Sequence, residues 1–189
     1  YGQIKVKKYN AYARILEDDS YEIIFCPYLL TLIDGLSIEL TNKYKEYLKL
    51  TGSLSRLFSD SLAPYLYYRA AENIFCLAFE AENLSRSDIS IDAKKGNIGF
   101  GLKTFLHGNG KTFQKIAEFN AIRNEYANKS DKEMVEFISK SRNKRLDICL
   151  EGYGVDSLIY HCLTRSDNLI SVYEFPMDKV QIDSIKKIV

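Results

Sequence analysis

The sequence of 189 residues lacks the features that mark several large classes of protein. It has no uninterrupted run of about 18 apolar residues, so it predicts no transmembrane helix. Its most apolar stretch, residues 21–40, is interrupted by Glu22, Pro27, Asp34 and Glu39, which favours a place in a protein core. The four cysteines form no Cys-x-x-Cys pair. This absence argues against the usual zinc and redox motifs, and favours buried free thiols in a cytosolic protein.

Strong charge and two common catalytic motifs are also missing. The net charge is +1, so a nucleic-acid partner would have to be bound by local basic clusters. No Gly-x-Ser-x-Gly motif is present, which argues against the nucleophile turn of many serine hydrolases. The Gly110-Lys111-Thr112 sequence lacks the glycine that a phosphate-binding loop requires at position 105, so ATP binding is not predicted.

The chain begins at Tyr1 without a methionine or a basic-then-apolar leader, so we expect a fragment of a longer protein that is located in the cytoplasm. With 46% hydrophobic and 27% charged residues, the composition is that of a globular domain with a real core. The length predicts a single domain over residues 1–189, with its core at about 54–175 and a helical N-terminal part at 1–53.

Hydrophobic periodicity and turn residues predict an alternation of helices and strands. Helices are expected at 29–50, 54–73, 111–129 and 131–141. Strands are expected at 21–26, 74–81, 145–152, 157–163 and 169–175, together with a hairpin at 87–105. This order predicts an α/β fold in which helices flank a central mixed β-sheet.

The hairpin at 87–105 carries the main functional signal. Its apolar and polar residues alternate, which predicts one buried face and one polar face. The buried face would hold Ile89, Ile91, Phe100 and Leu102. The polar face would hold Asp88, Asp92 and Lys103, with Gly99 and Gly101 leaving open space beside them.

Two registers of this hairpin are compatible with the sequence. If the chain reverses between Lys95 and Gly96, Asp88 lies opposite Lys103. If the turn is Gly96-Asn97, Ser90 lies opposite Lys103 and Asp88 becomes a diagonal neighbour at roughly 7–8 Å. Both registers leave Asp88 within reach of the lysine.

Carboxylates beside a lysine suit metal-assisted cleavage of a phosphodiester. The carboxylates hold a divalent cation, which polarises the phosphate and activates water, and the lysine orients the nucleophile or neutralises developing charge. Magnesium prefers oxygen ligands and keeps several waters, so one or two carboxylates suffice. The expected cofactor is therefore Mg²⁺.

The chain resembles the PD-(D/E)XK nuclease superfamily, the fold of many type II restriction endonucleases, in three features. It has an acid at the start of one strand, a lysine on the neighbouring antiparallel strand, and a glutamate on the preceding helix. The resemblance covers roughly residues 60–130. It assigns the family aspartate to Asp88, preceded by Ser87 instead of proline, the lysine to Lys103 and the helix glutamate to Glu72.

One position departs from the family pattern. The acid expected two residues before the lysine is replaced by Gly101, so the second carboxylate must come from elsewhere if the site is active. Glu118 on the following helix is the first candidate, and Asp92 is the second. Glu80 and Glu82 are further alternatives.

The resemblance implies a restriction-endonuclease-like fold and a magnesium-dependent endonuclease that cleaves double-stranded DNA as a homodimer. Asp88, with Glu118 or Asp92, would bind the metal, Lys103 would activate water and Glu72 would support the site. DNA backbone contacts are expected from the basic residues Lys94, Lys95, Lys111, Lys115, Arg142, Lys144 and Arg145. Two alternatives remain: an inactive nucleic-acid-binding or protein-interaction module of the same fold, and a repair nuclease that recognises DNA shape.

Overall fold

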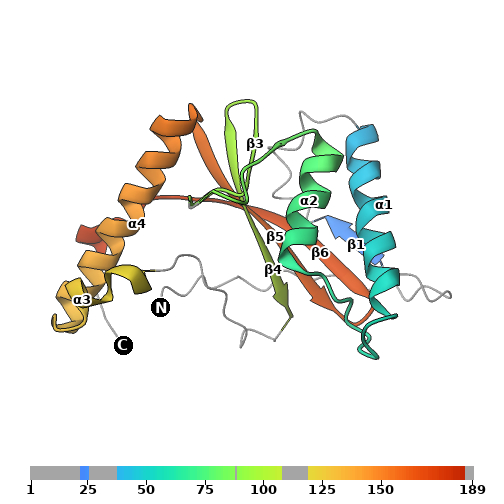
Figure 1. Ribbon diagram of the computed structural model, residues 1–189, viewed down its shortest axis with the longest axis horizontal. Coiled ribbons are helices and arrows are strands. Elements are labelled where there is room, and N and C mark those ends of the chain that lie inside the picture. The colour runs from blue at the N-terminus through green and yellow to red at the C-terminus, as the bar shows by residue number, and fades with distance from the viewer. Residues whose placement is uncertain (1–21, 26–37, 88, 108–118, 186–189) are drawn as a thin grey trace.

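The protein is built in three layers around a central sheet (Figure 1). The computed structural model describes residues 22–25, 38–87, 89–107 and 119–185. Helices α1 (Ile38–Ser55) and α2 (Tyr68–Phe79) cover one face of the sheet, and helix α4 (Asp131–Tyr153) packs on the other. The α/β architecture with helices on both sides of a mixed sheet, predicted from the sequence, is confirmed.

The sheet of the described residues has six strands in the order β1-β6-β5-β4-β3-β2. The strands are β1 (Glu22–Phe25), β2 (Glu82–Asn83), β3 (Ala93–Lys95), β4 (Ile98–Leu106), β5 (Ser157–Ser166) and β6 (Leu169–Pro176). β4 runs parallel to β5, and β1 runs parallel to β6, whereas the other neighbours are antiparallel. Since β4 and β5 are parallel, the chain must cross over between them, and it does so through α4.

Two hydrophobic clusters hold the layers together. The larger lies between α1, α2 and the sheet, and includes Tyr44, Leu48, Phe75, Phe79 and Phe100. The smaller lies between the sheet and α4, and includes Ile91, Leu146, Cys149, Tyr160 and Met177. The described part of residues 1–53 therefore belongs to the same core as the rest, and it contributes the strand β1 as well as a helix.

A buried polar chain ties α1 to the sheet. The Tyr44 hydroxyl lies 2.8 Å from Nε2 of His161, and Nδ1 of the same imidazole lies 2.8 Å from Oε1 of Glu174. His161 and Glu174 are direct neighbours on β5 and β6, and all three side chains are fully buried. Burial raises the pKa of Tyr44 well above its usual range, so its hydroxyl stays protonated.

Two predicted strands are helices instead. Residues 74–81 fall largely in α2, which buries one side against the sheet and another against α1, its neighbour on the same face of the sheet. Residues 145–152 fall in α4, where Leu146 and Cys149 are buried three positions apart while Ile148 is half exposed. Short apolar runs of this kind do not distinguish a strand from a buried helix.

The predicted helix at 54–73 is found only at its two ends, residues 54–55 and 68–73. α1 continues to Ser55 and α2 starts only at Tyr68, so residues 56–67 form an irregular connection. Pro64 lies inside this connection, and its carbonyl oxygen accepts a hydrogen bond from Arg165. Residues 29–37 of the first predicted helix lie outside the described residues.

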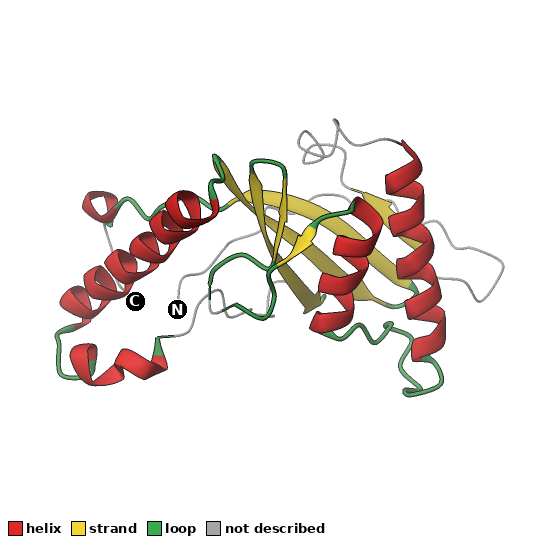
Figure 2. Cartoon of the chain, turned by 45° about the horizontal axis from the view of Figure 1, so that its top comes forward, coloured by secondary structure: helices red, strands yellow, loops and turns green. Residues whose placement is uncertain are grey.

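Other elements agree with the sequence. β1 lies within the strand expected at 21–26, and β5 and β6 cover the strands expected at 157–163 and 169–175. α4 starts at the predicted position, with Ser130 and Glu133 forming a capping box, and it continues twelve residues beyond the expected end at 141. Residues 108–118 lie outside the described part, which resumes before a 3-10 turn (Asn120–Ile122) and α3 (Arg123–Tyr126). Figure 2 shows α3 and the first turns of α4 reaching beyond the sheet.

None of the helices in the described part combines the length and the apolar character that crossing a bilayer requires.

Candidate active site

A cavity of about 220 Å³ lies between the first turn of α2 and the strand β4. Its lining residues are Tyr68, Arg69 and Glu72 of α2, Ser85 and Asp92 of the chain around β2 and β3, and Leu102, Lys103 and Thr104 of β4. The α2 residues are three and four positions apart, so they lie on one face of the helix. The cavity thus collects two carboxylates and two cationic groups from separate elements.

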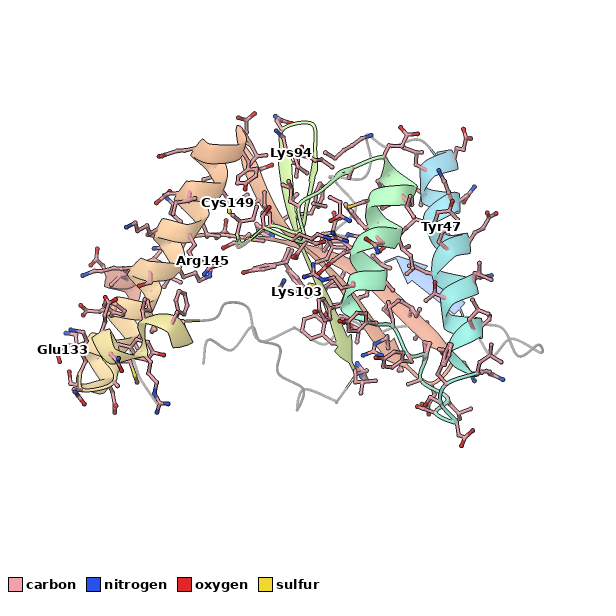
Figure 3. The ribbon with its side chains drawn as sticks, viewed as in Figure 1. Tyr47, Lys94, Lys103, Glu133, Arg145 and Cys149 are labelled. Carbon is pink, nitrogen blue, oxygen red and sulfur yellow. The ribbon has the colours of Figure 1, made fainter. Side chains whose placement is uncertain are left out.

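Asp92 and Lys103 form an ion pair in this cavity. Nζ of Lys103 lies 3.3 Å from Oδ2 of Asp92 and 2.9 Å from the carbonyl oxygen of Leu102. Both charged side chains are only about one-fifth exposed, at 19% and 20%. Figure 3 shows Lys103 near the middle of the molecule, beside α2. Partial exclusion of water strengthens such a pair relative to one on an open surface.

The backbone explains why Asp92 is held at this point. Ladder pairing of β3 with β4 ends at Ala93 and Phe100. One step further, the Asp92 amide still donates to the Phe100 carbonyl at 2.7 Å, and the Asp92 carboxylate accepts the Leu102 amide at 2.7 Å. The side chain therefore takes the place of a strand carbonyl where β3 separates from β4.

Glu72 is the second carboxylate of the cavity. It is 4% exposed and accepts a hydrogen bond from Arg69 at 3.0 Å, and Arg69 also donates to the Ser85 carbonyl. Burial raises the pKa of Glu72, and the negative charge of Asp92 raises it further, against the opposing effect of Arg69. The two carboxylates are therefore close enough to interact electrostatically.

The donor set suits a hard cation. The ammonium group of Lys103 is already held by carboxylate and carbonyl oxygens. Magnesium requires only one or two carboxylates, and Asp92 and Glu72 supply two. Within the described ranges, no three histidine, cysteine, aspartate or glutamate side chains gather in a group that could hold a metal ion. A cation here would complete its coordination with water, backbone oxygen or substrate.

The predicted acids are distributed unevenly around this cavity. Glu72 and Asp92 line it, whereas Asp88 and Glu118 lie outside the described residues. Of the two alternatives, Glu80 ends α2 with its carboxylate 70% exposed, and Glu82 is exposed on β2. Glu72, predicted to support the site from behind, faces the same space as Asp92 and Lys103.

The predicted basic residues of the hairpin contact protein groups. Lys94 donates to the Tyr153 carbonyl at 2.7 Å, at the end of α4, and Lys95 lies beside the Glu80 carboxylate. Lys111 and Lys115 lie outside the described residues.

The basic group on α4 lies against the opposite face of the sheet from α2. Arg142 donates to the Asp178 carbonyl and approaches the Tyr160 hydroxyl, while Lys144 is exposed and Arg145 is partly buried. In Figure 3, Arg145 extends from α4, well apart from Lys103.

The hairpin differs from prediction in register, length and packing. Lys95 pairs with Ile98, so the turn is Gly96-Asn97, the second of the two registers, and Gly96 has the positive φ of 56° that such a turn favours. β3 covers only Ala93–Lys95 instead of the whole of 87–95. β3 separates from β4 before Ala93 because the Asp92 side chain, instead of a backbone carbonyl, accepts the Leu102 amide.

The prediction of open space beside Gly99 and Gly101 is wrong. A Cβ added to Gly99 would lie 2.9 Å from Leu158 and 3.1 Å from Ile91, and one added to Gly101 would lie 2.6 Å from Met177. Both glycines are needed because buried side chains of the α4-side cluster approach the backbone closely. Ile91 is in that cluster, on the opposite side of the sheet from Phe100 and Leu102.

Sequence reasoning missed Arg69 and Tyr68 as cavity residues. The signal that could have found Arg69 is its spacing of three residues from Glu72 on a helix, which predicts an ion pair. The incorrect assignment of residues 74–81 to a strand hid the position of this helix face relative to β4.

Comparison with known proteins found no family model, no curated protein and no solved structure that matches this chain.

Proposed function

We propose that this chain is a magnesium-dependent nuclease with a restriction-endonuclease-like fold, and that it hydrolyses DNA phosphodiester bonds with Glu72, Asp92 and Lys103. The observation that carries the proposal is the presence of these three side chains in one cavity, with Lys103 3.3 Å from Asp92. By analogy with the PD-(D/E)XK superfamily, the proposed substrate is double-stranded DNA and the proposed assembly is a homodimer.

The order of the elements supports the proposal. Glu72 lies on a helix, the antiparallel strands β2, β3 and β4 follow, and Lys103 lies on the third of these. A helix then leads to β5, which is parallel to β4. This order agrees with the resemblance drawn from the sequence. Asp92 is the acid found beside Lys103 among the described residues, and Asp88, which lies outside them, stays the position that the resemblance gives to the family aspartate.

Each side chain has a distinct role in the proposed reaction. Asp92 and Glu72 would hold the cation. Bound Mg²⁺ would supply positive charge that polarises the phosphate and acidifies a water molecule. The Lys103 ammonium group would orient the attacking water or neutralise the developing charge on the phosphate. Arg69, which is 40% exposed at its side chain, would contact a neighbouring phosphate oxygen.

The second carboxylate comes from α2 in this proposal. The family position for it is Gly101, and Met177 and the Ser90 carbonyl fill the space that a side chain there would need. Glu72 instead reaches the cavity from the helix, and its pKa is raised by burial first and by the negative charge of Asp92 second. A cation between the two carboxylates would remove that repulsion.

Nicking of supercoiled plasmid in Mg²⁺ tests the function. We expect cleavage by the wild type, and a loss of roughly 100-fold or more in Lys103→Ala, Asp92→Asn and Glu72→Gln, comparable to removing a group that stabilises transition-state charge. Glu82→Gln is the matched control, because this exposed glutamate lies outside the cavity. Cleavage that persists in all three cavity variants would refute the site.

A non-catalytic DNA-binding module is the second candidate. It is favoured by the Lys103 contacts, which satisfy the ammonium group with Asp92 and a backbone carbonyl, and by the lack of a third acid in the described part of the cavity. DNA binding without cleavage at any Mg²⁺ or Mn²⁺ concentration would support this candidate over the nuclease.

A further inference from the structure

Three tyrosines at the start of α2 are unusually exposed. Tyr65, Tyr67 and Tyr68, named here the tyrosine ridge, keep 53%, 47% and 48% of their surface accessible. Tyrosine normally buries most of its ring when its role is to pack a core. Three half-exposed rings within four residues therefore indicate a surface that binds something.

The backbone under the ridge is firmly anchored. Pro64 and Leu66 are buried and alternate with the outward-facing Tyr65 and Tyr67, as expected for an extended segment. Arg165 donates to the Pro64 carbonyl at 3.1 Å, and the Tyr67 carbonyl accepts the first hydrogen bond of the helix, from Ala71. The rings therefore extend from a fixed frame, which lowers the entropic cost of binding.

The ridge is continuous with the proposed active site. The rings of Tyr67 and Tyr68 are in contact, with centroids 4.4 Å apart, and Tyr68 also lines the cavity that contains Lys103. The guanidinium of Arg69 lies 5.2 Å from the centre of the Tyr68 ring. Two exposed aromatic rings, tilted at 54° to each other, a cation and the cavity thus follow one another along the surface.

We propose that the tyrosine ridge stacks an unpaired nucleobase of the strand whose phosphate enters the cavity. This inference rests on the proposed function and narrows its substrate to DNA with an unpaired base beside the cleaved bond. A nucleotide presents a flat aromatic face and an anionic phosphate together, and the ridge and the cavity offer a partner for each. A base within an intact duplex is covered by its neighbours and cannot stack in this way.

The test uses DNA that contains the fluorescent base 2-aminopurine, in Ca²⁺ instead of Mg²⁺. Three probes are compared: a single strand, a duplex with one unpaired 2-aminopurine, and a fully paired duplex. The variants are Tyr67→Ala and Tyr68→Ala, each with its phenylalanine counterpart, which keeps the ring and removes only the hydroxyl. Leu77→Ala is the matched control, since Leu77 is an exposed apolar residue of the same helix that lies outside the cavity.

The wild type should bind the two unpaired probes more tightly than the paired duplex, with quenching of the 2-aminopurine. Each alanine variant should lose about 5- to 100-fold in affinity for the unpaired probes, the range expected for one base stack. The phenylalanine variants and Leu77→Ala should bind like the wild type. Any of three results would refute base stacking on the tyrosine ridge. They are equal binding of paired and unpaired probes, unchanged binding by the alanine variants, and equal losses in the alanine and phenylalanine variants.

Cleavage of the same three probes in Mg²⁺, measured beside plasmid nicking, keeps this outcome separate from the proposed function. Stacking-dependent binding without cleavage of any probe would support base stacking on the tyrosine ridge and refute the proposed nuclease activity. Cleavage that depends on Lys103 but not on the tyrosine ridge would refute the stacking proposal and leave the nuclease proposal in place. Failure to bind all three probes would refute both. Circular dichroism of each variant shows that a loss of binding does not come from unfolding.

Discussion

Replacing Gly101 with glutamate tests whether the second carboxylate of this site can come from position 101 or comes from Glu72 of α2. In the PD-(D/E)XK pattern, an acid at this position contributes to the metal site, so under the proposed function the substitution would supply the ligand that this pattern has there. In the structure, a Cβ at position 101 would lie 2.6 Å from Cε of Met177, 3.2 Å from the Ser90 carbonyl oxygen and 3.4 Å from the Tyr160 ring. We therefore expect the substitution to destabilise the fold without creating activity.

The expected cost follows from these contacts. Cε of Met177 is the flexible end of its side chain and can move, but this residue is only 4% exposed, and the Ser90 oxygen belongs to the backbone. Overfilling a packed core costs about 1–3 kcal/mol, so Gly101→Ala should destabilise by about 1 kcal/mol as Met177 shifts. Gly101→Glu adds a longer side chain and a charge excluded from water, and should cost several kcal/mol in total, on the order of 3–5.

Urea unfolding at pH 7 measures both values. Gly152→Ala is the control, because this glycine is in α4 with no atom within 4 Å of an added Cβ. It should stabilise the protein by about 0.5–1 kcal/mol. Plasmid nicking is measured in parallel. A Gly101→Glu variant that is as stable as the wild type and cuts faster would refute both the packing argument and the assignment of Glu72 as second carboxylate.

Three further outcomes follow from the buried and charged groups. His161→Ala should destabilise the fold by about 3–5 kcal/mol in urea unfolding, because it leaves the buried Glu174 carboxyl without its partner and removes a contact of Tyr44; a cost under about 1 kcal/mol would contradict this. The pKa of Glu72 is raised in the native state, so the free energy of unfolding should fall as pH rises from the ordinary glutamate pKa through the raised one. Glu72→Gln should abolish that fall. Identical pH profiles of the urea midpoint in the wild type and Glu72→Gln would refute this prediction. Addition of 10 mM Mg²⁺ should raise the melting temperature of the wild type by a few degrees, on the order of 2–5 °C for about 1 kcal/mol of binding energy, and should not raise that of Asp92→Asn; equal shifts in both proteins would place the ion elsewhere.

The sequence predicted the architecture where periodicity and turn residues agreed. β5 and β6 are long runs of alternating or β-branched residues on either side of Ser166-Asp167-Asn168, and Asn168 has a positive φ at their turn. α4 has a capping box at its start, which marks the boundary in the sequence itself. The two strands and the start of α4 needed no knowledge of tertiary contacts.

Prediction failed where tertiary packing decides the structure. The apolar run around Ile74 and Phe75 is a helix that packs against α1 beside it as well as against the sheet, which a local pattern does not show. Gly101 suggested open space, but the side chain that fills this space is Met177, distant in the sequence. Long-range neighbours of this kind cannot be found from spacing alone.

The candidate site was predicted in part for the same reason. The pairing of an acid with Lys103 follows from the hairpin and is found with Asp92. The inward position of Glu72 depends on how α2 packs on β4, and could be stated only through the resemblance. Arg69 and the tyrosine ridge depend on where α2 begins, which the sequence placed incorrectly.

A crystal of the protein soaked with Mn²⁺ would show whether Asp92 and Glu72 share a cation, because the ion can be located by its anomalous scattering. We expect one ion in the cavity, coordinated by a carboxylate oxygen of Asp92 and one of Glu72, with Lys103 displaced from its present contact. A cavity without an ion at millimolar Mn²⁺, or an ion bound only to other residues, would contradict it.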